Sequence, residues 1–431
     1  MNDLKGLSLI FRALSSRNYR LFFGGQGISL IGTWMQQIAM SWLVYRMTNS
    51  PFLLGLVGFS SQICSLFFSP FAGVISDRWN RHRILVATQS LAMIQALFLA
   101  ILTFTGVVTV LHLIILALFL GFVNAFDMPT RQAFVVEMVE KREDLANAIA
   151  LNSFLFNSAR LVGPSIAGVL IAILGEGMCF LINALSFLAV IVALLAMKVA
   201  YHKKRIQETQ ILQEFKEGLI YALGFPPIRS ILLFLGWISL IGTANTTLMP
   251  VFAKKILHGG PQTYGFLMAA IGAGAIIGAI FLASRTSVLG LGRIIAIASG
   301  IFGIGLISFS LSHFLWLSFS VLLLVGFGMM VHMASSNTIL QTMVDDDKRG
   351  RVMSLYVMAF MGMAPLGSLA GGSLADLIGA PYTLAIGGAS CLLGSFIFTK
   401  KLPTIRKMAR PIYIRKGILS EKSEIGIPNK Y

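Results

Sequence analysis

The chain has 431 residues, of which 56% are hydrophobic and 12% are charged, and its mean hydropathy is +0.81. This balance excludes a soluble globular domain and is typical of a chain that lies largely within a membrane. The formal net charge is +17. A strongly basic chain can bind nucleic acid, but the distribution of the charge, described below, argues against that partner.

A repeated segment indicates that the chain consists of two related halves. The residues Ile-Ser-Leu-Ile-Gly-Thr occur at 28–33 and again at 238–243, each time inside a long apolar stretch. At a slightly shorter offset, Gly73 matches Gly278 and Met138-Val139 matches Met343-Val344. A membrane chain built from two such halves is most often a transporter whose site lies between the halves.

Long apolar stretches predict twelve membrane-spanning helices in two sets of six. Each is roughly 18 to 29 residues long and continuous rather than alternating, which favours helices over barrel strands. The first set is predicted at Leu21–Tyr45, Phe52–Ile75, Ile84–Thr105, Leu111–Val136, Leu145–Ile173 and Met178–Met197. The second set is predicted at Ser230–Phe252, Tyr264–Ser284, Ile294–Ser312, Leu315–Leu340, Val352–Ala375 and Tyr382–Thr399.

These spans predict an all-α integral membrane fold of two pseudo-symmetric six-helix bundles. The expected organisation is an N-terminal bundle at 1–197, a cytoplasmic linker at 198–229, a C-terminal bundle at 230–399 and a basic cytoplasmic tail at 400–431. Within the linker, the pattern around 211–222 indicates an amphipathic helix at the membrane surface.

The basic residues predict the orientation of the spans. All but five of the 34 lysines and arginines fall on one side of the membrane if the N-terminus is cytoplasmic. Arg46, Lys254 and Lys255 fall on the other side, and Arg131 and Arg160 lie within spans. This is the positive-inside pattern. We therefore expect a multi-pass protein of a bacterial cytoplasmic (inner) membrane with both termini inside, in contact with membrane lipids and without nucleic acid as a partner.

The first span is not expected to be a signal peptide, because it is long, contains glutamines and lacks a convincing cleavage site. The cysteines Cys64, Cys179 and Cys391 lie in or at the edge of spans and have no metal-ligand spacing. They are expected to be buried small residues. No metal and no cofactor are predicted.

The loop after the second span carries the most specific local motif, Gly73-Val-Ile-Ser-Asp77-Arg78-Trp-Asn-Arg81-His-Arg83. An ordinary positive-inside loop would explain the arginines, but not Gly73 and Asp77 at this spacing. Here the chain resembles the major facilitator superfamily, whose signature in this loop is Gly-x-x-x-Asp-Arg-x-x-x-Arg. The resemblance covers essentially the whole chain and implies that Gly73, Asp77, Arg78, Arg81 and Arg83 form a conformational latch in a monomeric carrier. The second-half counterpart has Leu282 in place of the aspartate, so we expect an asymmetric latch.

The fifth span is similar to an element of the superfamily's exporters and antiporters, Gly-Pro-x-x-x-Gly. It reads Gly163-Pro164-Ser-Ile-Ala-Gly168. Glycines let helices pack closely and proline bends a helix, so Gly163, Pro164 and Gly168 are predicted helix-packing residues. The segment from Asp127 to Ala133, with Asn147 and Arg160, resembles a bacterial subfamily containing the enterobactin exporter and macrolide-efflux carriers. One departure is the lack of an arginine near Ala117, where many drug antiporters carry one.

Ionisable residues inside the spans are functional candidates, because charge at bilayer depth is costly. Asp127 and Arg131 share a helix face at i, i+4, and Arg160 lies midway along the fifth span. We predict that Asp127 is the proton-responsive group and pairs with Arg131 or Arg160. The alternative is a static buried pair that fixes helix register. His332 corresponds to Asp127 in the second half, and a buried hydrogen-bonded role is weighed there against a proton relay.

Polar residues at helical spacing in the first and seventh spans predict a substrate cavity, with helix–helix hydrogen bonding as the alternative for any single residue. With two arginines nearby, such a cavity suits a neutral or anionic amphipathic solute. The predicted lining is Gln26, Ser29, Thr33, Trp34 and Gln37 or its neighbour Gln36, with Ser239, Thr243 and Thr246 or Thr247 in the second half, and Trp237 near them.

We predict a secondary exporter of an amphipathic small molecule, a siderophore or a drug-like compound, driven by proton antiport with alternating access. The sequence has no catalytic constellation, ion filter or nucleotide-binding domain, so an enzyme, a channel and an ATP-driven pump are not expected. An importer or uniporter of a small solute and a non-transporting receptor of the same fold remain the alternatives.

Overall fold

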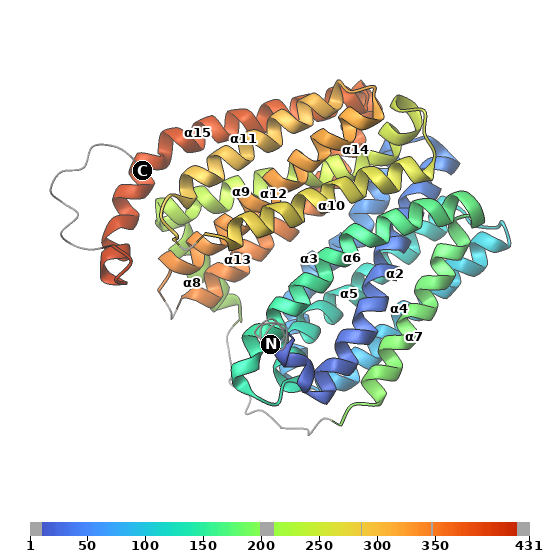
Figure 1. Cartoon of the computed structure of the whole chain (residues 1–431), viewed down its shortest axis with the longest axis horizontal. Helices are drawn as coiled ribbons and strands as arrows, with labels where there is room; N and C mark the ends of the chain where they lie inside the picture. The colour runs from blue at the N-terminus through green and yellow to red at the C-terminus, as the bar shows by residue number, and fades with distance from the viewer. Residues whose placement is uncertain (1–10, 199–210, 286, 346–347, 420–431) are drawn as a thin grey trace, which may run out of the picture. The chain divides into compact units, whose positions relative to one another are not determined.

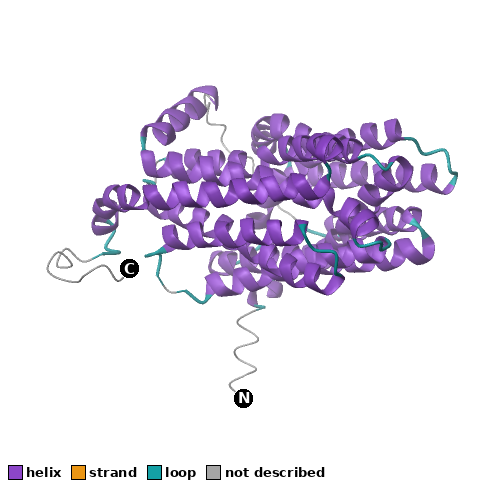
Figure 2. Ribbon diagram, turned by 90° about the horizontal axis from the view of Figure 1, so that it is seen from above, coloured by secondary structure: helices purple, strands orange, loops and turns teal. Residues whose placement is uncertain are grey.

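The protein is almost entirely helical in the computed structural model, which describes residues 11–198, 211–285, 287–345 and 348–419. Within these ranges there is no β-strand (Figure 2). The first-half helices are α2 (Arg17–Thr48), α3 (Pro51–Arg78), α4 (Arg81–Phe104), α5 (Val110–Met138), α6 (Leu145–Leu174) and α7 (Glu176–Leu195) (blue to green in Figure 1). Two short 3₁₀ turns, η1 (Arg12–Ser15) and η2 (Arg142–Asp144), precede α2 and α6.

The second half begins with α8, which lies in the predicted linker. Its helices are α8 (Ile211–Gly224), α9 (Pro226–Val251), α10 (Pro261–Ala283), α11 (Leu291–Ser310), α12 (Leu315–Met343), α13 (Arg349–Met361), α14 (Met363–Ile378) and α15 (Ala380–Arg415). A π-helical turn, η3 (Phe252–Ile256), extends α9. The linker helix predicted around 211–222 is confirmed as α8, and α15 makes the predicted tail helical as far as residue 415.

Eleven helices in the described ranges are long and apolar enough to cross a membrane, with α13 and α14 together forming one span, Arg349–Ile378. The first helix, α2, has 32 residues, but its glutamines keep it out of this apolar group. It nevertheless packs among the apolar helices α6 and α7. The prediction of an all-α integral membrane fold is confirmed.

Local sequence explains where several helices begin. Ser50 accepts a hydrogen bond from the backbone nitrogen of Leu53 (3.3 Å), and Pro51 occupies the first turn, where no backbone donor is needed. Asn80 accepts from Arg83 N (3.2 Å) at the start of α4. Thr109 and His112 form a reciprocal capping box at the start of α5. These caps fix the short connections, and therefore the antiparallel path, of α3, α4 and α5.

The structure divides into two compact units. Unit 1 contains residues 1–207, 246–272 and 368–377, and unit 2 contains 208–245, 273–367 and 378–431. Two segments of the second half thus belong to unit 1. The predicted division at 197 and 230 remains a prediction about the bundles as folding units.

Within each unit the same helices are neighbours, as expected of a duplication. In unit 1, α4 packs against α5 and α7, and in unit 2 the corresponding helix α11 packs against α12 and α15. In unit 1, α2 also contacts α6 and α7, and α3 contacts α5. A buried cluster that includes Tyr19, Phe22, Phe134 and Leu194 fills one end of this unit. Its members come from helices far apart in sequence, so burial of their apolar surface holds α2, α5 and α7 together.

Glycines allow the second-half segments of unit 1 to approach the first-half helices closely. A Cβ atom on Gly168 of α6 would lie 2.8 Å from the carbonyl oxygen of Pro261 and 3.2 Å from the Cα of Gly265 in α10. A Cβ on Gly55 of α3 would lie 3.0 Å from the Cα of Gly372 in α14. Backbones this close leave no room for side chains, which is the known use of small residues between membrane helices.

Candidate functional site

Asp127 lies buried between α4 and α5, where three donors surround its carboxylate. Oδ1 accepts hydrogen bonds from Thr88 Oγ1 (2.9 Å) and Gln89 Nε2 (2.7 Å), both in α4. Oδ2 lies 3.4 Å from Arg131 Nε, one helical turn further along α5. The residue is only 4% exposed. A buried carboxylate is stable only with such compensation, so these donors hold Asp127 as part of one polar cluster.

The polar cluster around Asp127 retains unused hydrogen-bonding capacity. Gln89 Oε1 and Thr130 Oγ1 are buried and have no hydrogen-bond partner among the described residues. Arg131 is 18% exposed and makes a single long contact with the carboxylate, so it is the most loosely held member. This arrangement suits a group that changes partners when its charge changes. The predicted pair of Asp127 with Arg131 is confirmed as a contact, whereas its role stays a prediction.

Arg160, the other predicted partner of Asp127, lies against an aromatic ring. Its guanidinium carbon is 5.9 Å from the centre of the Trp34 ring of α2. Phe156, one turn earlier on α6, packs edge-on to the same ring with a centroid distance of 5.9 Å. A guanidinium over a tryptophan face is a favourable cation–π arrangement. Together Arg160, Trp34 and Phe156 form a positively charged aromatic platform on α2 and α6.

The polar residues of α2 lie on more than one side of the helix. Gln26, Ser29 and Gln36 are buried, whereas Gln37 is exposed. Thr33 donates its hydroxyl to the Ser29 carbonyl (2.9 Å) within the helix. Of the predicted cavity residues in α2, Gln37 is therefore accessible, Thr33 and Trp34 are partly so, and Gln26 and Ser29 are enclosed by protein.

A buried amide network explains Gln36 without any substrate. Gln36 Nε2 donates to Gln95 Oε1 of α4 (2.9 Å), and Asn183 Nδ2 of α7 donates to Gln36 Oε1 (2.8 Å). Gln95 in turn donates to the carbonyl of Leu116 in α5 (3.2 Å). The network ties four helices together. Sequence reasoning missed Gln95, Asn183, Thr88 and Gln89, although amides and hydroxyls in the middle of apolar spans were a usable signal.

The second-half residues predicted to line a cavity bond mainly within the protein. Ser239 donates to the carbonyl of Phe360 in α13, and Thr243 donates to the Ser239 carbonyl (3.0 Å). Thr246 is partly exposed. Trp237 is 44% exposed and lies in a different place, in a groove between α9 and α15. These positions favour helix–helix bonding for Ser239.

His332 is buried in unit 2 with one ring nitrogen satisfied. Its Nδ1 lies 2.7 Å from Ser299 Oγ of α11, and the Ser299 hydroxyl is also 2.7 Å from the Ile295 carbonyl. Its Nε2 has no partner among the described residues. The Phe234 ring meets the imidazole edge-on at 5.0 Å. A neutral imidazole that donates from Nδ1 fits this setting, which agrees with the hydrogen-bonded alternative of the prediction.

Only part of the predicted latch can be described. The side chains of Gly73, Asp77 and Arg78 lie outside the described residues. Arg81 is buried at the start of α4, donating to Glu137 Oε1 of α5 (2.7 Å) and to the Ser76 carbonyl (3.2 Å). Arg83 is exposed. Glu137, which sequence reasoning missed, therefore joins Arg81 in a link between the latch loop and α5.

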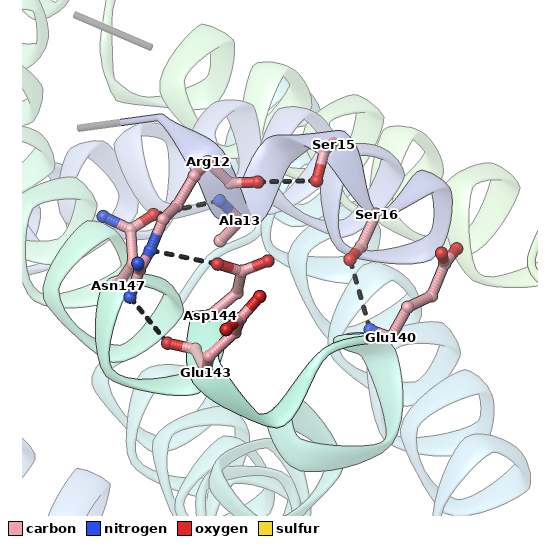
Figure 3. Close-up of polar contacts among 8 residues, drawn as sticks. All are labelled: Arg12, Ala13, Ser15, Ser16, Glu140, Glu143, Asp144 and Asn147. Carbon is pink, nitrogen blue, oxygen red and sulfur yellow. Dashed lines mark hydrogen bonds and ion pairs between the residues drawn. The ribbon is translucent and has the colours of Figure 1, made fainter. Parts of the chain in front are cut away.

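Asn147, one of the residues that carry the subfamily resemblance, belongs to a clamp of polar contacts between η1 and the start of α6 (Figure 3). Its Oδ1 accepts from the backbone nitrogen of Ala13 (3.0 Å), while Arg12 forms an ion pair with Asp144 (3.0 Å). Arg12 also donates to the Glu143 carbonyl (2.6 Å). Figure 3 shows η1 lying over the connection between α5 and α6. The clamp therefore fixes the chain at the start of α6, the helix that carries Arg160.

The packing role predicted for the fifth span is supported by geometry. A Cβ on Gly163 would lie 2.5 Å from the Cβ of Trp34, so glycine lets α6 bring Arg160 next to that ring. Pro164 removes the backbone donor that would bond to the Arg160 carbonyl. That carbonyl lies 3.2 Å from where a Cβ on Gly272 would be. Gly168 makes the close approach to α10 described above.

A family model described as "transmembrane secretion effector" matches residues 10–412, which is nearly the whole chain. The chain belongs to this family of the major facilitator superfamily. The predicted resemblance is therefore confirmed. As a member of this family the protein is a multi-pass membrane transporter of small molecules rather than an enzyme, as the sequence predicted.

Two similar proteins align with most of this chain. The staphyloferrin A transporter of Staphylococcus aureus is 28% identical over 381 residues, covering 88% of this chain and 95% of the relative. The multidrug efflux pump Tap of Mycobacterium tuberculosis is 25% identical over 404 residues, covering 89% and 91%. These relatives transport different kinds of compound, so similarity alone does not decide between them.

Solved structures support the fold of this transporter. A bacterial homologue of the iron transporter ferroportin, in an inward-facing state, matches with a TM-score of 0.71 over 89% of this chain and 98% of that chain, at 15% identity. The nucleoside transporter NupG matches with a TM-score of 0.69 over 90% and 98%, at 13% identity. At this level of identity the likeness concerns the fold alone.

The described residues of the transporter contain no group of three or more His, Cys, Asp or Glu side chains that could hold a metal ion. The three cysteines are free, and Cys179 and Cys391 are buried.

Proposed function

We propose that this transporter exports a neutral or anionic amphipathic small molecule from the bacterial cytoplasm in exchange for protons. The observation that carries the proposal is the buried carboxylate of Asp127, held inside a membrane helix by Thr88, Gln89 and Arg131. Ionisable groups at this depth mark ion or substrate pathways. The kinship with a siderophore transporter and with multidrug efflux pumps supports export.

In the proposed cycle, a proton arriving from outside neutralises Asp127 and weakens its attraction for Arg131. Arg131 is the more exposed partner and can then turn towards solvent, in the state that releases the solute outside and returns without it. Loss of the proton to the cytoplasm restores the ion pair, in the state that takes up solute from the cytoplasm. Thr88 and Gln89 keep the carboxyl group in place in both states, because a carboxylic acid still accepts hydrogen bonds. The two states of this cluster would bias the alternating access of the carrier.

The platform of Arg160, Trp34 and Phe156 is the proposed contact for the solute. An aromatic face beside a guanidinium suits a flat or aromatic compound that carries carboxylate or other acidic oxygens. This chemistry fits a siderophore better than a lipophilic cation, so a siderophore is the first substrate class to test. A drug-like compound is the second, supported by the multidrug relatives.

Direct measurement of export tests the substrate class. Cells with and without the intact gene are grown under iron starvation, and their media and cytoplasm are compared by untargeted mass spectrometry. We expect an iron chelator to be depleted from the medium and to accumulate inside the deletion cells. An unchanged chelator profile, with increased sensitivity to lipophilic compounds, would move the substrate to the drug class.

Proton coupling is tested in everted membrane vesicles with an imposed pH gradient. We expect the Asp127→Asn protein to lose at least about tenfold of its gradient-driven uptake while remaining inserted, because a neutral side chain cannot carry the proton. Asp376→Asn is the matched control, since Asp376 is an exposed carboxylate of α14. Full gradient-driven uptake by Asp127→Asn would remove Asp127 from the coupling mechanism, and solute entry into cells would favour an importer.

A further inference from the structure

A groove of about 320 Å³ runs between α9 and α15, entirely within unit 2. Its lining is mostly apolar and comes from both helices: Leu233, Phe234 and Trp237 of α9, with Leu393, Ile397 and Phe398 of α15. Phe234 and Phe398 stack at its base with a centroid distance of 5.1 Å. Glycine at 394 keeps it open, because a Cβ there would lie 2.8 Å from the Phe234 ring.

The groove faces away from the protein core. Leu233 is 65% exposed, Leu393 60% and Ile397 46%. Both helices are membrane spans, so these side chains face the surrounding lipid rather than water. An acyl chain is therefore the molecule most available to fill the groove.

Two cations define one end of the groove. Arg229 lies in the first turn of α9, and Lys401 lies in α15, where apolar residues give way to basic ones. Both are exposed, and neither has a hydrogen bond or ion pair with another described side chain. Trp237 lies eight residues beyond Arg229, or about 12 Å of helical rise. That depth is close to one leaflet, about half of the ~30 Å hydrocarbon core.

We propose that this groove binds one anionic phospholipid, with its phosphate between Arg229 and Lys401 and an acyl chain along Leu233 and Trp237. Basic residues beside an apolar groove between membrane helices have the chemistry that recognises anionic headgroups. Under the predicted topology the lipid belongs to the cytoplasmic leaflet. The site is separate from the Asp127 cluster and does not depend on the proposed function.

Trp237 supplies a direct readout. The full-length protein, with Trp34, Trp42, Trp79 and Trp316 replaced by Phe, is reconstituted with a brominated lipid, which quenches nearby tryptophan fluorescence. We expect brominated phosphatidylglycerol to quench at about tenfold lower mole fraction than brominated phosphatidylcholine, given two cations near the headgroup. The wild-type protein provides a second measurement, in which native mass spectrometry counts the lipids retained from an equal mixture of the two lipids.

Matched variants separate this site from general surface charge. R229Q/K401Q removes the two groove cations, while K400Q/K407Q removes two exposed cations that do not line the groove. We expect the first pair to abolish the preference for the anionic lipid and the second to retain it. Equal quenching by both lipids, or a preference that survives R229Q/K401Q, would overturn the proposal.

Discussion

At the scale of single residues, Asp127 and Arg131 differ in how much they depend on one another. Asp127 is almost fully buried and has two further donors, whereas Arg131 is partly exposed and forms an ion pair with the carboxylate. Breaking a buried pair is costly mainly because of the charge that is left behind. The two single substitutions should therefore have unequal effects.

We expect Arg131→Met to destabilise the protein by about 2–4 kcal/mol, because it leaves the buried Asp127 carboxylate without a counter-charge. Asp127→Asn should cost less, since Arg131 can turn towards solvent. The double variant should regain most of the stability lost by Arg131→Met. Apparent melting temperatures in detergent measure all three, and an equal loss in both single variants would contradict this account.

The neighbouring glutamines of α2 provide a second residue-scale prediction. Gln36→Leu leaves Asn183 and Gln95 without their buried partner, so we expect a loss of about 1–3 kcal/mol. Gln37→Leu, one residue away and exposed, should leave the melting temperature unchanged. If the two variants behave alike, the amide network does not stabilise the bundle.

At the scale of helices, sequence indicated that glycine and proline in α6 serve close packing but could not identify the neighbour. Gly163 brings α6 against α2, and Gly168 brings it against α10. The first contact positions Arg160 beside Trp34. The second joins a first-half helix to a second-half segment inside unit 1, so its loss should affect transport as well as stability.

We expect Gly168→Leu to reduce transport at least about tenfold, because a side chain cannot fit where the α10 backbone is 2.8 to 3.2 Å from a Cβ. Gly24→Leu is the control, since a Cβ on Gly24 of α2 meets nothing within 4 Å. Export by both proteins is measured at matched membrane levels. Normal transport by Gly168→Leu would show that this approach is not required in the cycle.

Residues near the two ends of the described chain form ion pairs with corresponding interhelical connections of the two halves. In unit 1, Arg12 pairs with Asp144 before α6, and in unit 2, Arg415 pairs with Asp345 after α12. Lys416 also donates to the carbonyls of Thr342 (2.9 Å) and Val344 (2.8 Å), which the end of a helix leaves unpaired. Part of the basic excess at the chain ends therefore has a structural use in addition to its predicted effect on topology.

At the scale of the whole molecule, two of the three basic residues predicted to lie outside, Arg46 and Lys254, have specific partners. Arg46 forms a two-pronged ion pair with Glu176 (2.7 and 3.2 Å), and Lys254 donates to Asn49 (2.7 Å). Such contacts explain why these cations occur despite the positive-inside bias. The orientation of the chain in the membrane stays a prediction, which labelling from either side can test.

We expect a cysteine at Val107 to react with a membrane-impermeant maleimide in intact cells, and a cysteine at Gly224 to react only after permeabilisation. Both positions are exposed, in the connection between α4 and α5 and at the end of α8. The background replaces Cys64, Cys179 and Cys391 with Ser. The reverse labelling pattern would invert the predicted topology.

The sequence by itself determined the helical membrane fold, the duplication and the presence of Arg131 on the same helix face as Asp127, while leaving Arg160 open as the other partner. These properties depend on apolar length, internal repetition and spacing within one helix, which are all local in the chain. Only the tertiary structure decided that Thr88 and Gln89 complete the Asp127 cluster, that Gln36 is enclosed while Gln37 is accessible, and that Trp237 faces the groove between α9 and α15. The reason is that α2 carries polar residues on several sides, so the rotation of each helix about its axis is set by its neighbours rather than by its own pattern.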